Sequence, residues 1–86
     1  MEVSVELTLT PLQDDFEAPI IEFIKCLRAS EFRVLENPLS TQIYGDYNKL
    51  MPFLNKEIEK AFASCDHILL NMKIVKSNRS DYEPHF

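Results

Sequence analysis

Residues 2–10, EVSVELTLT, alternate without a break between apolar and polar side chains. Successive side chains of a β-strand point to opposite faces of the sheet, so this period of two predicts a strand with one dry face. Pro11 ends the pattern, because proline has no N–H group to donate to a sheet. The dry face needs an apolar layer to pack against, and the rest of the chain must supply that layer.

Two segments with helical spacing can supply it. The first runs through residues 19–30, with Pro19 in its first turn, and the second starts near Asp46 to Asn48 and runs to about Ser64. We expect the first helix to bury Phe16, Ile20, Phe23, Ile24 and Leu27, and the second to bury Leu50, Leu54, Ile58, Ala61 and Cys65, with Phe53 projecting away from that face.

Three further strands complete the order of elements. Residues 32–36 and 41–45 are typical of a hairpin joined by the turn NPLS, and residues 67–75 alternate as a last strand. The order β-α-β-β-α-β predicts an α+β, ferredoxin-like fold, a four-stranded antiparallel sheet with both helices on one face. The first and third strands would be central neighbours. We expect one domain over residues 1–76 and a polar C-terminal tail over residues 77–86.

Charge and composition exclude several classes of function. The net charge of -5 argues against nucleic-acid binding, which needs a basic surface, and favours a cationic ligand. Cys26 and Cys65 with two histidines do not form a zinc-ligand pattern, so no metal is expected. The chain shows no catalytic grouping, no glycine-rich phosphate loop, no signal peptide and no membrane-length apolar run. We expect a cytoplasmic protein that is not an enzyme, with no cofactor and no membrane partner.

The face of the sheet away from the helices must be wet, bind a ligand or meet another subunit. The alternation places a polar mixture on it: Ser4, Glu6, Thr8, Gln42, Tyr44, Leu69, Asn71 and Lys73. Such a surface can hold a small polar ring compound, with Glu6 facing an amino group or a positive charge. The alternatives are a half-wet sheet face, or a dimer interface in which Glu6 pairs with Lys73.

Gly45 is the only glycine of the chain and lies at the end of a predicted strand. A chain that forms its other turns without glycine is expected to place its single copy where a side chain does not fit. We therefore expect close packing at this strand end, with direct contact to a ligand as the alternative, and Asp46 capping the second helix.

The segments VELTLTPL, PIIEFIKCL and LSTQIYGDYNKLM together resemble the thiamine-binding (YkoF-like) family across nearly the whole domain. The family pattern has a strand ending in Pro-Leu, a helix started by proline, and a Thr-x-Ile/Val-x-Gly-Asp/Glu stretch. That stretch is Thr41, Ile43, Gly45 and Asp46 here. The chain departs from the pattern at Tyr44, where the family usually has an acidic residue.

The resemblance implies a non-enzymatic protein that binds thiamine or its hydroxymethylpyrimidine half. It implies that Glu6 and Asn71 hydrogen-bond the aminopyrimidine edge, that Ser40 or Thr41 donates at the strand end, and that Tyr44 stacks on the ring. The full set of ligand contacts that it implies is Glu6, Thr8, Ser40, Thr41, Tyr44 and Asn71.

Self-association is also implied, because members of this family form dimers and tetramers through their sheets. Apolar groups that a small domain would leave in water point the same way. We expect a homodimer or tetramer in which the tail, with Tyr82 and Phe86, lies across a neighbour. The alternative function is a structural or regulatory oligomerisation module whose open face is consumed by self-association and takes no ligand.

Overall fold

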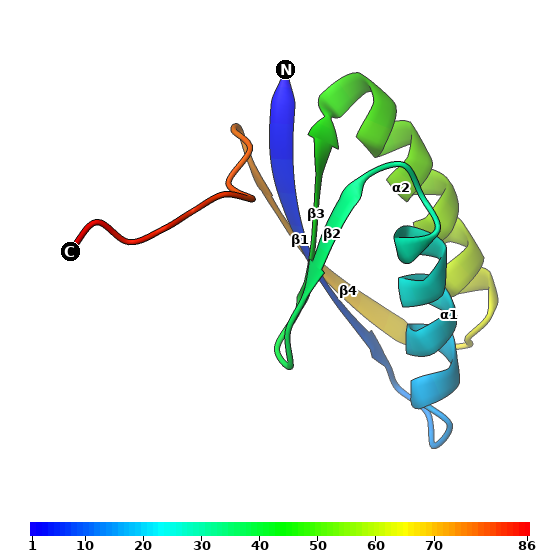
Figure 1. The fold of residues 1–86 in the computed structure, drawn as a ribbon. Coiled ribbons are helices and arrows are strands. Elements are labelled where there is room, and N and C mark those ends of the chain that lie inside the picture. Colours follow the sequence, from blue (N-terminus) through cyan, green and yellow to red (C-terminus); the bar gives the residue numbers. More distant parts are fainter.

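The computed structural model describes residues 1–86 and has the predicted order of elements. They are β1 (Glu2–Pro11), α1 (Glu17–Arg28), β2 (Arg33–Glu36), β3 (Thr41–Asp46), α2 (Tyr47–Ala63) and β4 (Ile68–Val75). The four antiparallel strands follow the order β2-β3-β1-β4, and both helices cover one face of the sheet (Figure 1). The α+β ferredoxin-like prediction is confirmed. Neither helix is long and apolar enough to cross a membrane.

The core is the apolar layer between the helices and β1. Val3, Val5 and Leu7 of β1 are at most 2% exposed, as the alternation predicts. They belong to the same buried cluster as Leu27 of α1 and Leu54 of α2, both of which are fully buried. Each such aliphatic side chain contributes roughly 1.5–3 kcal/mol to stability by leaving water. The dry face of β1 therefore determines which side of each helix faces the sheet.

The apolar stripe of α1 begins later than predicted. Phe23 and Leu27 are buried, and Ile20 and Ile24 are half-buried, as expected. Phe16 is instead the residue that caps the helix start, and it is 51% exposed. Its assignment to the stripe was wrong, because a residue before the first helical turn leaves the layer that the helix shares with the sheet.

Gly45 lies beneath the ring of Phe32. A β-carbon at this position would come within 2.6 Å of Cδ1 and 3.0 Å of Cε1 of Phe32. No residue of the chain has a positive φ, so space and not backbone conformation requires the glycine. The expected close packing is confirmed, and its partner is this ring.

The ring of Phe32 also corrects the prediction for Phe53. The two ring centroids are 5.4 Å apart, and both side chains pack against the buried cluster. Phe53 does not project away from the core. Phe32, the residue directly before β2, extends the apolar layer, and the ring of Phe53 packs against it.

Asp46 caps α2 as predicted. Its side chain accepts a hydrogen bond from the N–H of Asn48 at 3.2 Å and one from the amino group of Met1 at 3.1 Å. The bond from the Met1 amino group is the main cause that lowers the pKa of Asp46 below its usual value. The N–H of Tyr47 donates to the carbonyl of Met1 at 2.8 Å. The start of β1 is thus tied to the junction of β3 and α2.

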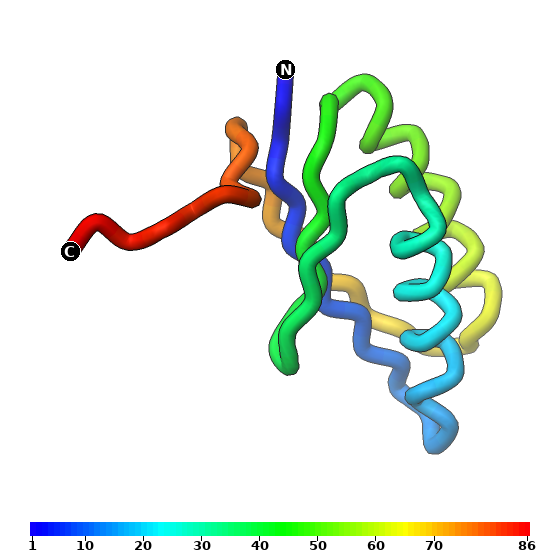
Figure 2. Tube along the Cα trace, in the orientation of Figure 1, coloured from blue at the N-terminus to red at the C-terminus, as the bar shows by residue number.

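The first half of the C-terminal tail lies on the chain's own sheet, on the side away from the helices (Figure 2). The hydroxyl of Ser4 donates to the carbonyl of Ser77 at 2.7 Å and accepts from the N–H of Arg79 at 2.8 Å. Residues 82–86 make no contact of this kind and project from the sheet. The expectation that the tail crosses a neighbour therefore stays a prediction for residues 82–86 alone.

The docked tail covers Tyr44. This residue lies opposite Ser4 on one side and Arg33 on the other, and Arg33 pairs with Asp81 at 2.8 Å. Tyr44 is consequently only 8% exposed. The expectation that Tyr44 is an exposed group of the open face was wrong, because residues far away in the sequence fold back over it.

Replacement of Gly45 by alanine is expected to lower the free energy of unfolding by about 1–3 kcal/mol, because the Phe32 ring must move out of a packed layer. Urea unfolding of Gly45→Ala measures the loss. Phe32→Ala serves as the partner variant, since it removes the two ring atoms, Cδ1 and Cε1, that the new methyl group meets. The double variant should lose less than the sum of the single losses. Additive losses would contradict this account of the glycine.

Candidate functional site

The side chains of Glu6, Ser40 and Gln42 form a hydrogen-bonded cluster on the open face, which we term the Glu6 cluster. The hydroxyl of Ser40 donates to Oε2 of Glu6 at 3.0 Å, and Nε2 of Gln42 donates to the Ser40 hydroxyl at 2.7 Å. The strand register explains the cluster, because Glu6 lies opposite Gln42 on β3 and opposite Lys73 on β4. The Nζ atom of Lys73 is 3.8 Å from Oε1 of Glu6. One carboxylate oxygen is thus held by Ser40, and the other faces Lys73 and solvent.

This cluster can receive a cation or an amino group at Oε1 of Glu6. The side chain of Lys73 is 73% exposed, and an ion pair in such a position contributes at most about 1 kcal/mol. A ligand with a positive group can therefore replace Lys73 at little cost. The hydroxyl of Ser40 already gives its only proton to Glu6, so in this arrangement it can accept from a ligand but not donate. The donor role predicted for Ser40 does not fit this network.

A cavity of about 200 Å³ opens next to the cluster, between β1, α1 and the turn that joins β2 to β3. We term it the hairpin pocket. Ser40 lines this pocket and also belongs to the Glu6 cluster, so the two features are contiguous. Apolar and polar side chains share the lining: Leu7, Leu9, Ile20, Ile24, Pro38 and Leu39 on one hand, and Thr8, Asn37, Ser40 and Thr41 on the other.

The hairpin pocket forms where the sheet has a gap. The last pair between β1 and β3 is Leu7 with Thr41, yet β1 continues to Pro11. The edge of β1 at Thr8 and Leu9 therefore has no neighbour on that side, although β4 still pairs with it on the other. Side chains from both faces of the sheet can reach a ligand at this gap.

Thr41 offers a polar contact in the hairpin pocket. It is 8% exposed, and its hydroxyl has no hydrogen-bond partner within the chain. Because Thr41 pairs with Leu7, whose side chain faces the helices, it lies on the opposite side of the sheet from Glu6. Water can reach this hydroxyl, because the one side-chain oxygen of the chain that is both buried and without a partner is Oγ of Ser77. The pocket therefore offers Thr41 as a free polar contact.

The remaining predicted contacts divide between the pocket and the open face. Thr8 is half-buried and lines the pocket. Asn71 lies opposite Thr8 on β4 and is exposed, one strand away from the pocket. Tyr44 lies under the tail and is not free to stack on a ring. The structure thus brings together Glu6, Thr8, Ser40 and Thr41, leaves Asn71 at the margin and separates Tyr44.

Sequence reasoning missed the contribution of three residues to this site. Gln42 was assigned to the open face but not to the ligand contacts, and its hydrogen bond to Ser40 depends on the hairpin geometry. Ile20 and Ile24 were assigned only to the core, yet they form a wall of the pocket. Their dual position follows from the gap in the sheet, which leaves part of α1 without a strand beneath it.

The hairpin pocket combines an apolar wall with hydroxyls and a nearby carboxylate, the mixed lining that is typical of sites for small molecules. The chain belongs to the thiamine-binding protein family, which it matches over residues 5–85. That match confirms the resemblance and extends through the tail segment that docks on the sheet.

Solved structures of three other proteins have the same fold. A protein from Streptococcus pneumoniae shows 29% identity and a TM-score of 0.83 over 91% of this chain and 89% of its own. A candidate thiamine biosynthesis/salvage protein from Thermotoga maritima shows 15% identity and a TM-score of 0.80 over 90% of this chain and 85% of its own. A hypothetical protein from Methanocaldococcus jannascii shows 19% identity and a TM-score of 0.73 over 95% of this chain and 84% of its own. No curated protein matches the chain.

Replacement of Thr41 by valine tests whether its hydroxyl is free. Valine has nearly the same shape, so Thr41→Val should leave the free energy of unfolding unchanged or raise it by up to about 1 kcal/mol. The control is Ser4→Ala, which removes a hydroxyl that makes two hydrogen bonds and should cost about 1–2 kcal/mol. Chemical denaturation of both variants measures the difference. A loss for Thr41→Val as large as that for Ser4→Ala would show that the hydroxyl has a partner in the folded chain.

Proposed function

We propose that this protein binds thiamine or its hydroxymethylpyrimidine half without transforming it, with the pyrimidine ring in the hairpin pocket. Membership of the thiamine-binding family supports a small-molecule ligand. The related fold from Thermotoga maritima is described as a candidate thiamine biosynthesis/salvage protein, which supports the same ligand class. The observation that carries the placement is the hairpin pocket, which Ser40 of the Glu6 cluster and the hydrogen-bond-free hydroxyl of Thr41 both line.

The size of the pocket supports a single ring inside it. Its volume of about 200 Å³ lies below the range of roughly 300–1,000 Å³ that accommodates drug-sized ligands. The pyrimidine ring would pack between Ile20 and Ile24 and the free edge of β1. The thiazolium ring of thiamine would then lie outside the pocket, on the open face.

Polar groups around the gap supply the specificity in this proposal. The hydroxyls of Thr8 and Thr41 would donate to ring nitrogens, and Oε1 of Glu6 would accept from the exocyclic amino group. Asn71 would contribute from the margin of the site. Stacking by Tyr44 would require residues 77–81 to leave the sheet, so we assign Tyr44 to the wall beneath the tail and not to the ligand.

Isothermal titration calorimetry with thiamine and with hydroxymethylpyrimidine tests the proposal. Both ligands should bind, and Glu6→Gln should weaken binding by about 10- to 100-fold, because a hydrogen bond to a charged group is worth roughly 1.5–3 kcal/mol. Glu59→Gln is the matched control, since Glu59 is an exposed carboxylate on α2 outside both features. The absence of heat with either ligand at millimolar concentration would refute the function.

The free edge of β4 favours self-association as a second function. β4 pairs only with β1, so its outer edge is unpaired over Ile68–Val75. The strand contains no proline or glycine, and Met72 and Ile74 are 42% and 43% exposed. An edge of this kind is ready to pair with another strand. We infer that two copies join edge to edge through β4, with or without a bound ligand.

Sedimentation equilibrium at micromolar concentration tests the assembly. We expect a species of at least twice the 10.0 kDa chain mass. Ile74→Lys should shift the equilibrium towards the monomer, because a charge on an edge strand opposes pairing. Thr10→Lys places the same charge on a β1 residue that β4 already pairs, and it should leave the assembly intact. A single species at the mass of one chain would exclude the oligomerisation module.

A further inference from the structure

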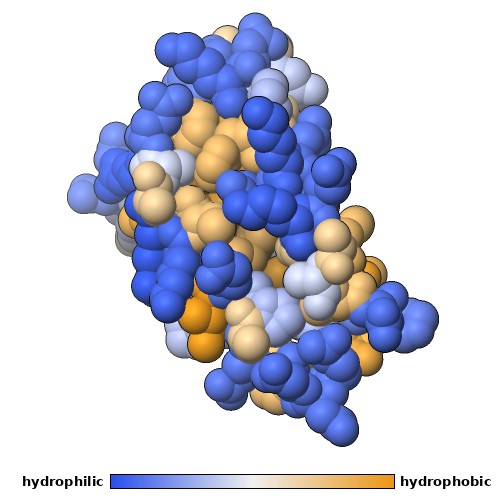
Figure 3. Space-filling view, turned by 90° about the vertical axis from the view of Figure 1, so that its right-hand side faces the viewer, coloured by the Kyte–Doolittle hydropathy of each residue, from blue (hydrophilic) through white to orange (hydrophobic).

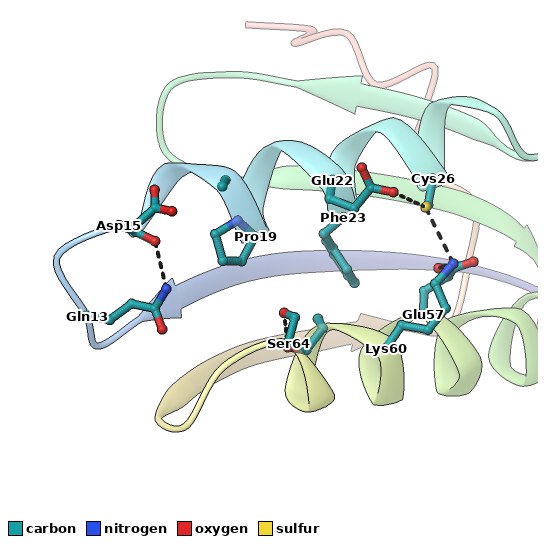
Figure 4. Close-up of a pocket in the computed structure, with 11 residues that line it drawn as sticks. Gln13, Asp15, Pro19, Glu22, Phe23, Cys26, Glu57, Lys60 and Ser64 are labelled. Carbon is teal, nitrogen blue, oxygen red and sulfur yellow. Dashed lines mark hydrogen bonds and ion pairs between the residues drawn. The ribbon is translucent and has the colours of Figure 1, made fainter.

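The larger cavity of the molecule lies on the helix side and contains polar groups that bond to one another. On this side, apolar residues gather in the middle of the surface and hydrophilic residues flank them (Figure 3). The cavity between the two helices measures about 310 Å³ (Figure 4). Nζ of Lys60 lies 2.9 Å from Oε2 of Glu57, and Nε2 of Gln13 donates to the carbonyl of Asp15 at 2.8 Å. Backbone groups without a partner lie instead in the hairpin pocket.

The backbone of Leu9 points into the gap between β1 and the turn before β3. In an antiparallel strand, the N–H and C=O groups of one residue point to the same side, and the side alternates from residue to residue. On the β3 side, the carbonyl of Met1 accepts from the N–H of Tyr47. On the β4 side, the N–H of Leu12 donates to the carbonyl of His67. Both ladders have a continuous register, so the odd-numbered residues of β1 face β3, and Leu9 does so beyond the end of that ladder.

Both backbone groups of Leu9 lack a partner in the chain. The register places Leu39 opposite Leu9, yet the N–H of Leu39 donates to Oδ1 of Asn37 at 2.8 Å. The same oxygen accepts from the N–H of Ser40 at 3.0 Å, so Asn37 closes the turn on itself and leaves the edge of β1 open. Leu9 is 9% exposed and lines the hairpin pocket. Because buried N–H and C=O groups are nearly always paired, we expect a bound molecule to pair with these two.

We propose that Leu9 recognises the edge of the ligand through its backbone, as a facing strand would. Its N–H donates to a ring nitrogen, and its C=O accepts from the amino group beside that nitrogen, which is the pattern that an aminopyrimidine presents on one edge. The second hydrogen of the amino group remains for Oε1 of Glu6. This inference rests on the proposed function and narrows the class of ligand to planar rings in which a nitrogen acceptor adjoins an amino donor.

Hydrogen exchange of the backbone amides, followed by NMR, tests the pairing in the unaltered protein. Without ligand, the amide of Leu9 should exchange about tenfold or more faster than that of Leu7, because Leu7 lies in the ladder opposite Thr41. Hydroxymethylpyrimidine at ten times its Kd should slow exchange at Leu9 by about tenfold. Equal protection of the two amides without ligand would overturn the proposal, and so would exchange at Leu9 that a bound ligand leaves unchanged.

An ester bond in place of the amide of Leu9 removes the N–H group and keeps the side chain. The matched control is the same ester at Leu7, and both full chains can be assembled by ligation of synthetic segments at Cys26. Each ester weakens one carbonyl acceptor towards β4, so the difference between the two measures the N–H alone. The Leu7 ester should unfold at a lower urea concentration than the Leu9 ester, because only Leu7 loses a ladder bond.

Calorimetry on the two ester chains separates this inference from the proposed function. The Leu9 ester should bind hydroxymethylpyrimidine about tenfold more weakly than the unaltered protein, and the Leu7 ester should bind it equally well. An analogue with an oxo group in place of the amino group carries a hydrogen on the adjoining nitrogen, so the Leu9 ester should not weaken its binding further. Binding of hydroxymethylpyrimidine that the Leu9 ester leaves unchanged would refute this inference alone. The absence of heat with the unaltered protein would refute the proposed function as well.

Discussion

The pairing of β1 with a neighbour on each side is the interaction on which the rest of the structure depends. The ladder to β3 spans Glu2–Leu7, and the ladder to β4 spans residues 4–11. The two ladders are offset, so β1 continues beyond its last pair with β3 while it still pairs with β4. That offset opens the sheet beside Thr8 and places a cavity there. A single strand thus organises the core through one face and the candidate site through its unequal edges.

The fold could be predicted from the sequence because it rests on periodicities that are local. The alternation of β1 and the helical spacing of α1 and α2 each appear within one segment. Apart from Phe16, which lies before the first turn of α1, the errors concern residues whose surroundings come from elsewhere in the chain. Phe53 is covered because Phe32 precedes the neighbouring strand, and Tyr44 is covered because the tail returns to Ser4. No local pattern carries that information.

The site was predicted in part for the same reason. Alternation places Glu6 and Thr8 on the open face, and the family resemblance points to Ser40 and Thr41. Alternation with Gln42 also puts Thr41 on the helix side, but that α1 forms a wall beside it depends on where the β3 ladder stops. The tail divides the open face into a covered part around Tyr44 and an accessible part around Glu6. An assembly through the edge of β4 leaves that division undisturbed, whereas stacking of whole sheet faces would displace the tail.

The absence of any residue with positive φ has a consequence for how such chains diverge. A turn that needs a left-handed residue restricts its sequence to glycine and a few polar residues. Here the backbone of every turn accepts ordinary side chains. The sequences of the loops can therefore change while the packing of the helices on the sheet is retained. This freedom is consistent with a fold retained at a TM-score of 0.80 in a protein of 15% identity. Selection on such a scaffold acts through packing volume and surface chemistry more than through the geometry of its turns.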